Sequence, residues 1–460
     1  PTCPSMIRAL IERYETLPYR FPLLAGGGEK LQRLFTREDL DSESANSEWR
    51  EYTKLTYPIL HAAVPELIHD FLRIKKQYGS AKEKALYAKM TLEDFVTRLL
   101  TKRPLVFFNG NDTWMLKDNQ KGYMGFDDIG KDTEQPPLVI EDLQSYDEMA
   151  ISALLGVSVY TPFINEGGRG NRGQVAPYGA FVPKGVYTGV VGARFERANL
   201  MEWKHLIVTQ EQNIASNGYG GTADPNTSED AALLKAWAKF YGVPHLPTYA
   251  EAQVARASHR ADFVDLPGGM LLNAKLYKRR MRMSIEPFLL DADERAAKMG
   301  KRAYVHAVGL GLGVWMVDET QGQLMVDVYA EIMQERDLKH TAILDFSWFP
   351  ESCYQCGDAF SGGSFNAGKG PRIIFSRRNP ADPLNFADPN LRDESADSLL
   401  LVAMYAWDGN SYPGNEYWMG MLDASGAPAA ACSSAIDVLQ NPDLNPEQLC
   451  GEAAQVLPRQ

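Results

Sequence analysis

The sequence predicts an α/β fold in which a largely parallel sheet lies between helices. Strand and helix patterns alternate in the last third of the chain, with a buried strand over residues 304–312, an amphipathic helix over 323–336 and a strand over 341–346. Units at this spacing favour right-handed crossovers in a parallel sheet that is covered on both faces. Further strands are expected over 372–375 and 399–405, and a helix over 428–439 is expected to close the domain.

The first hundred residues differ from the rest because their pattern is mostly helical. Apolar residues recur at spacings of three and four over residues 48–60, 64–78 and 91–100, and Thr91 is a good helix N-cap. No set of catalytic residues converges in this region. We therefore expect residues 1–103 to form a helical accessory region and residues 104–460 to form an α/β catalytic domain.

The middle of the chain mixes short strands, glycine-rich loops and helices. Strands are expected over 105–108, 157–160 and 185–195, loops over 167–173 and 218–226, and helices over 145–155, 230–241, 249–260 and 291–299. The glycines of 185–195 leave little room for side chains, so another backbone or a ligand can approach that strand closely.

Composition excludes several classes of protein. The 460 residues carry a net charge of −12, and the densest basic run, residues 278–282, is short and interleaved with apolar residues. We interpret that run as the solvated face of a helix or strand, and we expect no nucleic-acid partner. The longest apolar run, 303–317, is too short to span a bilayer. Five scattered cysteines are typical of a reducing compartment, so we expect a cytoplasmic protein. No feature of the sequence requires an oligomer, so we expect a monomer.

The first candidate strand end is glycine-rich. The predicted strand over 304–312 runs into three glycines at alternate positions, Gly309, Gly311 and Gly313. Backbone amides without side-chain bulk can approach a diphosphate, but the same glycines also admit a closely packed neighbour. Both readings stay open. The order of the glycines differs from the dinucleotide-binding fingerprint, which disfavours a Rossmann site.

Two further strand ends carry carboxylates. Asp345 follows an apolar strand, where an unpaired carboxylate is costly to bury, so a role in a site is favoured slightly over a structural hydrogen bond. Residues 407–418 hold Asp408, Glu416, Asn410 and Asn415 among four aromatic residues. The amides can bind ribose hydroxyls, and the carboxylates can act as acid, base or stabiliser of positive charge. A structured loop is the alternative.

Two motifs that resemble known sites are discounted. Residues 363–370 nearly match a phosphate-binding P-loop, but Gly370 stands where the magnesium-binding hydroxyl is needed, and a strand follows instead of a helix. This loop, which includes Asn366, remains a candidate to close over a ligand. Cys353 and Cys356 have the spacing of metal ligands but lack a second pair, so no metal is expected.

Several short segments between residues 150 and 425 carry a resemblance to a known family. They are Gly192-Ala-Arg-Phe-Glu196, Gln212-Asn213, Asn217-Gly-Tyr219, Val308-Gly-Leu-Gly-Leu-Gly313, Leu344-Asp-Phe-Ser347 and Trp407-Asp-Gly-Asn410. The sequence resembles MavL-type macrodomains, which are ADP-ribosylhydrolases distantly related to poly(ADP-ribose) glycohydrolases. The glycohydrolase signature, a triple glycine followed by Gln-Glu-Glu, is absent. Its nearest echo is Thr209-Gln-Glu-Gln-Asn213.

The resemblance implies a macrodomain-like mixed sheet with ADP-ribose across the strand ends. It implies hydrolysis of the bond between the distal ribose and a modified side chain, plausibly arginine, in an ADP-ribosylated protein, without a cofactor or metal. A non-catalytic reader of ADP-ribose or another nucleotide is the alternative. The candidate catalytic residues are Asp345, Asp358, Asp408 and Glu416. The candidate ligand-binding residues are Gly309, Gly311, Gly313, Asn366, Asn410, Asn415, Arg194 and Phe195.

Overall fold

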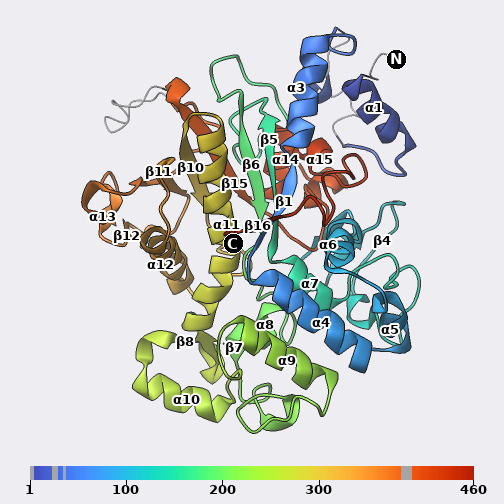
Figure 1. Ribbon diagram of the computed structural model, residues 1–460, viewed down its shortest axis with the longest axis vertical. Helices are drawn as coiled ribbons and strands as arrows, with labels where there is room; N and C mark the ends of the chain where they lie inside the picture. The colour runs from blue at the N-terminus through green and yellow to red at the C-terminus, as the bar shows by residue number, and fades with distance from the viewer. Residues whose placement is uncertain (1–4, 23–28, 35–37, 385–395, 460) are drawn as a thin grey trace.

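The computed structural model describes residues 5–22, 29–34, 38–384 and 396–459. Its centre is a mixed eight-stranded sheet in the order β14-β11-β10-β15-β6-β5-β1-β16 (Figure 1). The five strands from β14 to β6 run parallel, while β5 is antiparallel to both of its neighbours. The strands are β1 (Tyr57–His61), β5 (Leu155–Pro162), β6 (Lys184–Val190), β10 (Arg302–Val308), β11 (Thr341–Ser347), β14 (Arg372–Ser376), β15 (Leu399–Ala406) and β16 (Gln455–Leu457). This large, mostly parallel sheet confirms the predicted fold class.

Helices cover both faces of the sheet. The 25-residue helix α11 (Ala274–Lys298) crosses one face and packs beside α12 (Thr320–Glu335), as Figure 1 shows. On the other face lie α14 (Ala427–Ser433) and α15 (Ile436–Leu439). The sequence predicted one helix over 428–439, but the chain breaks between these two short helices. It also predicted only the last turns of α11, because Pro287 and the basic run masked the rest of that helix.

The N-terminal region contributes both helices and a strand. Helices α4 (Val64–Tyr78) and α6 (Leu92–Thr101) confirm two predicted helices, and Thr91 caps α6 in a reciprocal capping box with Asp94. The helix expected over 48–60 was wrong in its second half. Helix α3 (Glu43–Lys54) ends early, because Pro58 removes a backbone donor, and residues 57–61 instead form β1 in the central sheet. The other helices here are α1 (Met6–Thr16), α2 (Glu29–Leu34) and α5 (Ala81–Tyr87).

Smaller elements surround the ends of the central strands. They are β2 (Val106–Phe108), β3 (Thr113–Met115), β4 (Lys121–Gly122), α7 (Tyr146–Ser152), α8 (Glu202–Leu206), β7 (Ile207–Val208), α9 (Glu229–Phe240), α10 (Tyr249–Ser258), β8 (Phe263–Asp265), β9 (Leu271–Asn273), β12 (Gln355–Cys356), β13 (Ala359–Phe360) and α13 (Phe365–Gly368). Among the described residues, no helix combines the length and the apolar character that crossing a membrane requires.

The basic run over 278–282 lies in α11, and its central residue is not solvated. Arg280 is 0 % exposed, so the interpretation of a solvated face was wrong at this position. Its Nε donates to Glu202 Oε1 at 2.8 Å, and its Nη2 donates to the carbonyl oxygens of Ala153, Val191 and Gly192. Arg280 therefore ties α11 to α8 and to the segment that follows β6.

Replacing Arg280 by leucine is expected to destabilise the fold by about 3–5 kcal/mol, because Glu202 is left as an unpaired buried charge. Lys275→Leu on the same helix is the matched control. The Lys275 side chain is 53 % exposed, so its replacement is expected to change the free energy of unfolding by no more than about 0.5 kcal/mol. Denaturant unfolding of both variants measures the difference. Equal effects would show that the Arg280 contacts contribute nothing particular.

Candidate functional site

The loops after β6, β10 and β15 meet at the carboxyl edge of the sheet, where ligands of parallel sheets usually bind. Their backbones are in direct contact. A Cβ placed on Gly192 would lie 2.5 Å from the carbonyl carbon of Leu310, and one on Gly311, whose φ is +69°, would lie 2.9 Å from Ala193 O. Packing of one loop against another therefore requires glycine at both positions.

The three predicted glycines of the loop after β10 have different surroundings. Gly311 is needed for packing, and a Cβ on Gly309 would crowd Leu312 of its own loop. Gly313 has open space where its Cβ would be, and the backbone around it is exposed. Of the two readings left open by the sequence, close packing therefore applies to Gly311, while the exposed backbone at Gly313 is free to approach a ligand.

Two carboxyl groups lie close together in the loop after β15. Asp408 is partly buried, and its Oδ2 accepts a hydrogen bond of 2.6 Å from Asn415 Nδ2. Burial and the nearby charge of Glu416 raise the pKa of Asp408 to about 8, although Arg194 opposes that rise. Burial also raises the pKa of Glu416. At neutral pH, Asp408 is therefore mostly protonated, so this pair offers an acid beside a second carboxyl group.

Asn415 fixes the position of this pair. Its Oδ1 accepts a hydrogen bond of 2.9 Å from the backbone N–H of Phe107, while its Nδ2 donates to Asp408. The amide thus connects the loop after β15 to β2. Asn410, in the same loop, is buried, and its Oδ1 has no hydrogen-bond partner in the part of the chain that the structure describes. A buried acceptor without a partner is costly, so a donor supplied by a ligand hydroxyl would be favourable there.

Arg194 brings a positive charge to the same edge. Its Nη2 lies 3.2 Å from Glu196 Oε2 and 3.5 Å from Asp112 Oδ1, and its backbone N–H donates to Glu202. Trp315, which follows the glycine-rich loop, donates from Nε1 to Glu196 Oε2 at 3.2 Å. Arg194 and Glu196 thus connect the loop after β6 to the loop after β10.

Phe195 does not face this cluster. It is buried, and its ring packs 6.4 Å from the ring of Tyr277 on α11. Phe195 is therefore a core residue, and its packing holds the loop after β6 in place between Arg194 and Glu196. That Phe195 contacts a ligand stays a prediction.

Asp345 lies inside β11 and not beyond its end, because the strand continues to Ser347. Its Oδ2 accepts a hydrogen bond of 2.7 Å from Tyr304 Oη and lies 3.8 Å from Arg378 Nε, while its Oδ1 has no hydrogen-bond partner among the described residues. Asp345 pairs in register with His306, which pairs with Ala403 of β15. Strand spacings then place the backbone of Asp345 roughly 14 Å from that of Ala406, where β15 ends.

Asp358 and Asn366 lie together, away from the loops after β6 and β15. The carboxylate of Asp358 accepts hydrogen bonds from the backbone N–H groups of Asn366 and Ala367, both of which have positive φ. These bonds lower the pKa of Asp358, which is exposed. The Asp358 carboxylate therefore stabilises the turn at residues 366–367. Strand β14 follows this turn, whereas a helix would follow a P-loop.

Sequence reasoning missed several residues of the cluster. Asp112, Glu202, Arg280 and Trp315 were not singled out, although Glu196 was part of a recognised segment. Trp315 lies just after the glycine-rich loop, and that position in the sequence could have marked it as a candidate. The others come from distant elements, and only the fold brings them together. Cys353, Cys356, Cys432 and Cys450 are all free thiols, and Cys3 lies outside the described residues.

Comparisons with known proteins give consistent results. Residues 35–460 match the model of a family described as ADP-ribosylhydrolase MavL-like. The chain is 37 % identical over 421 residues to the ADP-ribosylarginine hydrolase CG3568 of Drosophila melanogaster, which covers 89 % of this chain and 79 % of the relative. It is 36 % identical over 399 residues to the ADP-ribosylarginine hydrolase CG2909 of the same organism, covering 85 % and 76 %.

The raised pKa of Asp408 predicts a pH-dependent effect on stability. Between its ordinary pKa and about 8, the folded protein holds a proton that the unfolded chain releases, so stability falls as pH rises through this window. Asparagine does not titrate. The melting temperature of Asp408→Asn relative to that of the unchanged protein is therefore expected to rise from pH 4 to pH 8, as followed by calorimetry.

Asp358→Asn provides a control of opposite sign. The pKa of Asp358 is lowered, so its carboxylate stabilises the fold above its ordinary pKa, and the variant is expected to lose stability relative to the unchanged protein as pH rises from acid values. A pH-independent difference for Asp408→Asn would contradict the proposed environment of Asp408.

Proposed function

Because the chain belongs to the MavL-like family of ADP-ribosylhydrolases, we propose that it releases ADP-ribose from ADP-ribosylated arginine side chains of proteins. The names of the two fly relatives support arginine as the modified residue. The observation that supports this site is the Asp408–Glu416 pair, in which burial raises the pKa of both carboxyl groups. The free thiols of the described cysteines agree with a reducing, cytoplasmic location.

The reaction needs an acid and a base on opposite sides of one bond. Water attacks C1″ of the distal ribose, and the bond from C1″ to the guanidine nitrogen breaks with its electron pair going to nitrogen. Asp408 gives its proton to that nitrogen, while Glu416 in its ionised form takes a proton from the attacking water. The positive charge that develops at C1″ is favoured by the carboxylates around it.

The neighbouring groups hold the substrate. In this proposal, the exposed backbone at Gly313 approaches the diphosphate. The buried Oδ1 of Asn410 accepts a hydrogen bond from a ribose hydroxyl. Asn415 orients Asp408 through its hydrogen bond of 2.6 Å. Asp345 acts in this proposal as a structural residue of the sheet, through its bond to Tyr304.

Removing the acid is expected to abolish turnover. Asp408→Asn keeps the shape of the side chain but cannot donate the proton, so the release of ADP-ribose from a mono-ADP-ribosylated arginine peptide is expected to slow by about a hundredfold or more. Asp345→Asn is expected to retain activity within about tenfold, since asparagine can still accept from Tyr304. Chromatography of released ADP-ribose measures both rates.

The pH profile and ligand binding separate the alternatives. The rate is expected to fall as pH rises through about 8, where Asp408 loses its proton. Calorimetry is expected to show that Asp408→Asn still binds ADP-ribose. If the unchanged protein binds ADP-ribose but releases none, it is a reader. If Asp345→Asn is the inactive variant, the catalytic carboxylate is Asp345.

A further inference from the structure

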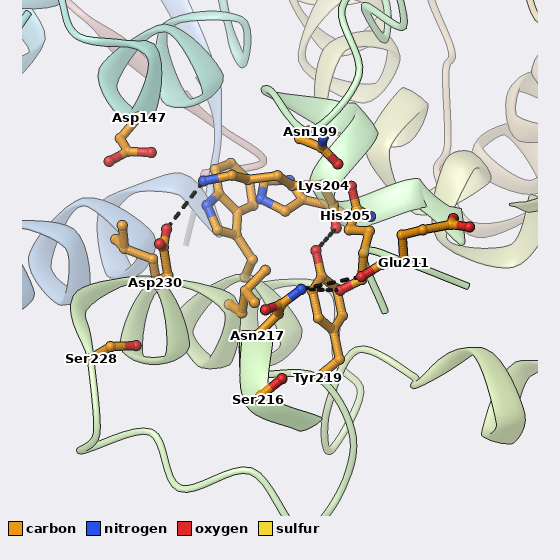
Figure 2. Close-up of a pocket in the computed structure, with 14 residues that line it drawn as sticks. Asp147, Asn199, Lys204, His205, Glu211, Ser216, Asn217, Tyr219, Ser228 and Asp230 are labelled. Carbon is orange, nitrogen blue, oxygen red and sulfur yellow. Dashed lines mark hydrogen bonds and ion pairs between the residues drawn. The ribbon is translucent and has the colours of Figure 1, made fainter. Parts of the chain in front are cut away.

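A polar cavity lies between α8, α9 and the loop that follows β7. It is near the group of polar residues at the carboxyl edge of the sheet, which we call the strand-end cluster (Asp112, Arg194, Glu196, Asp408, Asn410 and Glu416). The volume of the cavity is about 370 Å³, and Figure 2 shows the side chains that line it. None of the residues assigned above to the reaction lines it. The volume is within the range of cavities that hold small ligands or single side chains of a partner.

The lining has an excess of negative charge. Asp147, Glu211 and Asp230 line the cavity together with one lysine, Lys204, which lies 3.2 Å from Asp230. Asp147 pairs with Lys75, but Lys75 also pairs with Glu83 and Glu229, so three carboxylates share that single charge. Glu211 has no ion-pair partner among the described residues. The cavity therefore repels an anion such as a diphosphate and attracts a cation.

Two buried polar atoms at the cavity have no hydrogen-bond partner among the described residues. Gln212, only 8 % exposed, donates from Nε2 to Ile207 O and Asn213 Oδ1, which leaves its Oε1 without a partner. His205, only 6 % exposed, has no partner for Nδ1, and burial together with the charge of Lys204 lowers its pKa to about 3. A neutral imidazole and an amide oxygen are both able to accept hydrogen bonds.

The cavity lining also includes an aromatic side chain. The ring of Trp237, which also lines the cavity, lies 4.3 Å from the ring of His205. Carboxylates, unpaired acceptors and an indole face are the groups that bind a planar cation rich in N–H donors. The guanidinium of arginine has this chemistry, and a lysine ammonium, a compact and strongly hydrated charge, matches it less well.

The cavity and the strand-end cluster are neighbours. Residues 194–202 connect them, since Arg194 belongs to the cluster and Asn199 lines the cavity. Five residues of chain span at most about 18 Å. On the other side, Tyr146 donates to Asp112 of the cluster, and the next residue, Asp147, lines the cavity. A peptide bound at the cluster can therefore reach the cavity within a few residues.

We propose that this cavity binds an unmodified arginine side chain of the protein substrate, a few residues from the ADP-ribosylated arginine. This inference rests on the proposed function for the identity of the substrate, but binding of arginine itself can be measured without any turnover. The cavity then selects substrates in which arginines are clustered.

The binding test uses N-acetyl-arginine amide, with N-acetyl-citrulline amide as an uncharged probe of the same shape. Calorimetry is expected to show that the protein binds the arginine probe at least about tenfold more tightly than the citrulline probe. Glu211→Gln/Asp230→Asn is expected to lose that difference. Glu211→Gln alone, at an exposed position, is expected to lose part of it and guards against misfolding of the double variant.

Asp41→Asn/Glu43→Gln is the matched control, because it also removes two exposed carboxylates, one in the turn before α3 and one at the start of α3, which pair with Arg8 and Arg50. This variant is expected to keep the preference for the arginine probe. Equal binding of the two probes, or a preference that survives in Glu211→Gln/Asp230→Asn, would overturn the assignment of the cavity.

A second readout uses two ADP-ribosylated peptides that differ only by arginine or citrulline at a flanking position. The unchanged protein is expected to show a KM about tenfold lower for the arginine peptide, with similar kcat, and the double variant is expected to lose that ratio. If neither peptide is hydrolysed while the arginine probe still binds, the proposed function fails and the cation site stands. Equal KM values would contradict the role of the cavity in substrate selection.

Discussion

The buried guanidinium of Arg280 holds together the elements on which the site depends. It extends from the second turn of α11 to three carbonyl oxygens and to Glu202, and Glu202 in turn accepts a hydrogen bond from the backbone N–H of Arg194. A charge in this position is tolerated only because every contact is made, and removal of either partner leaves the other buried without compensation. One network therefore fixes the long helix, the segment after β6 and the arginine of the candidate site relative to one another.

That constraint places two kinds of chemistry side by side. At the carboxyl edge of the sheet, burial favours the neutral form of Asp408, which costs stability and gives the site an acid near neutral pH. Beside it, the cavity at Trp237 concentrates negative charge and unpaired acceptors. The first environment suits bond cleavage in an ADP-ribosylated residue, and the second suits a cation on the same polypeptide. The segment over residues 194–202 contributes side chains both to the site at the strand ends and to the cavity, so its position affects the geometry of both.

Local patterns were enough to predict much of the fold, and they failed where tertiary contacts decide. Strands β11 and β14 were predicted because apolar residues run through them, and α4 and α6 because their spacing is helical. Helix α11 was missed in large part, since Pro287 and a basic run are typical of exposed or broken segments, and only burial against Glu202 explains Arg280. At the candidate site, the segment from Trp407 was found because its polar residues are contiguous. Its partners Arg194 and Phe107 lie more than 200 residues away in the sequence, and nothing local in the sequence reports such contacts.

A crystal structure of the protein with ADP-ribose tests the central claim most directly, because it shows which residues surround the distal ribose. The account predicts that the hydroxyl on C1″ lies within hydrogen-bonding reach of Asp408 or Glu416, with the diphosphate against the backbone at Gly313. A distal ribose beside Asp345, or a diphosphate in the cavity at Trp237, would contradict it.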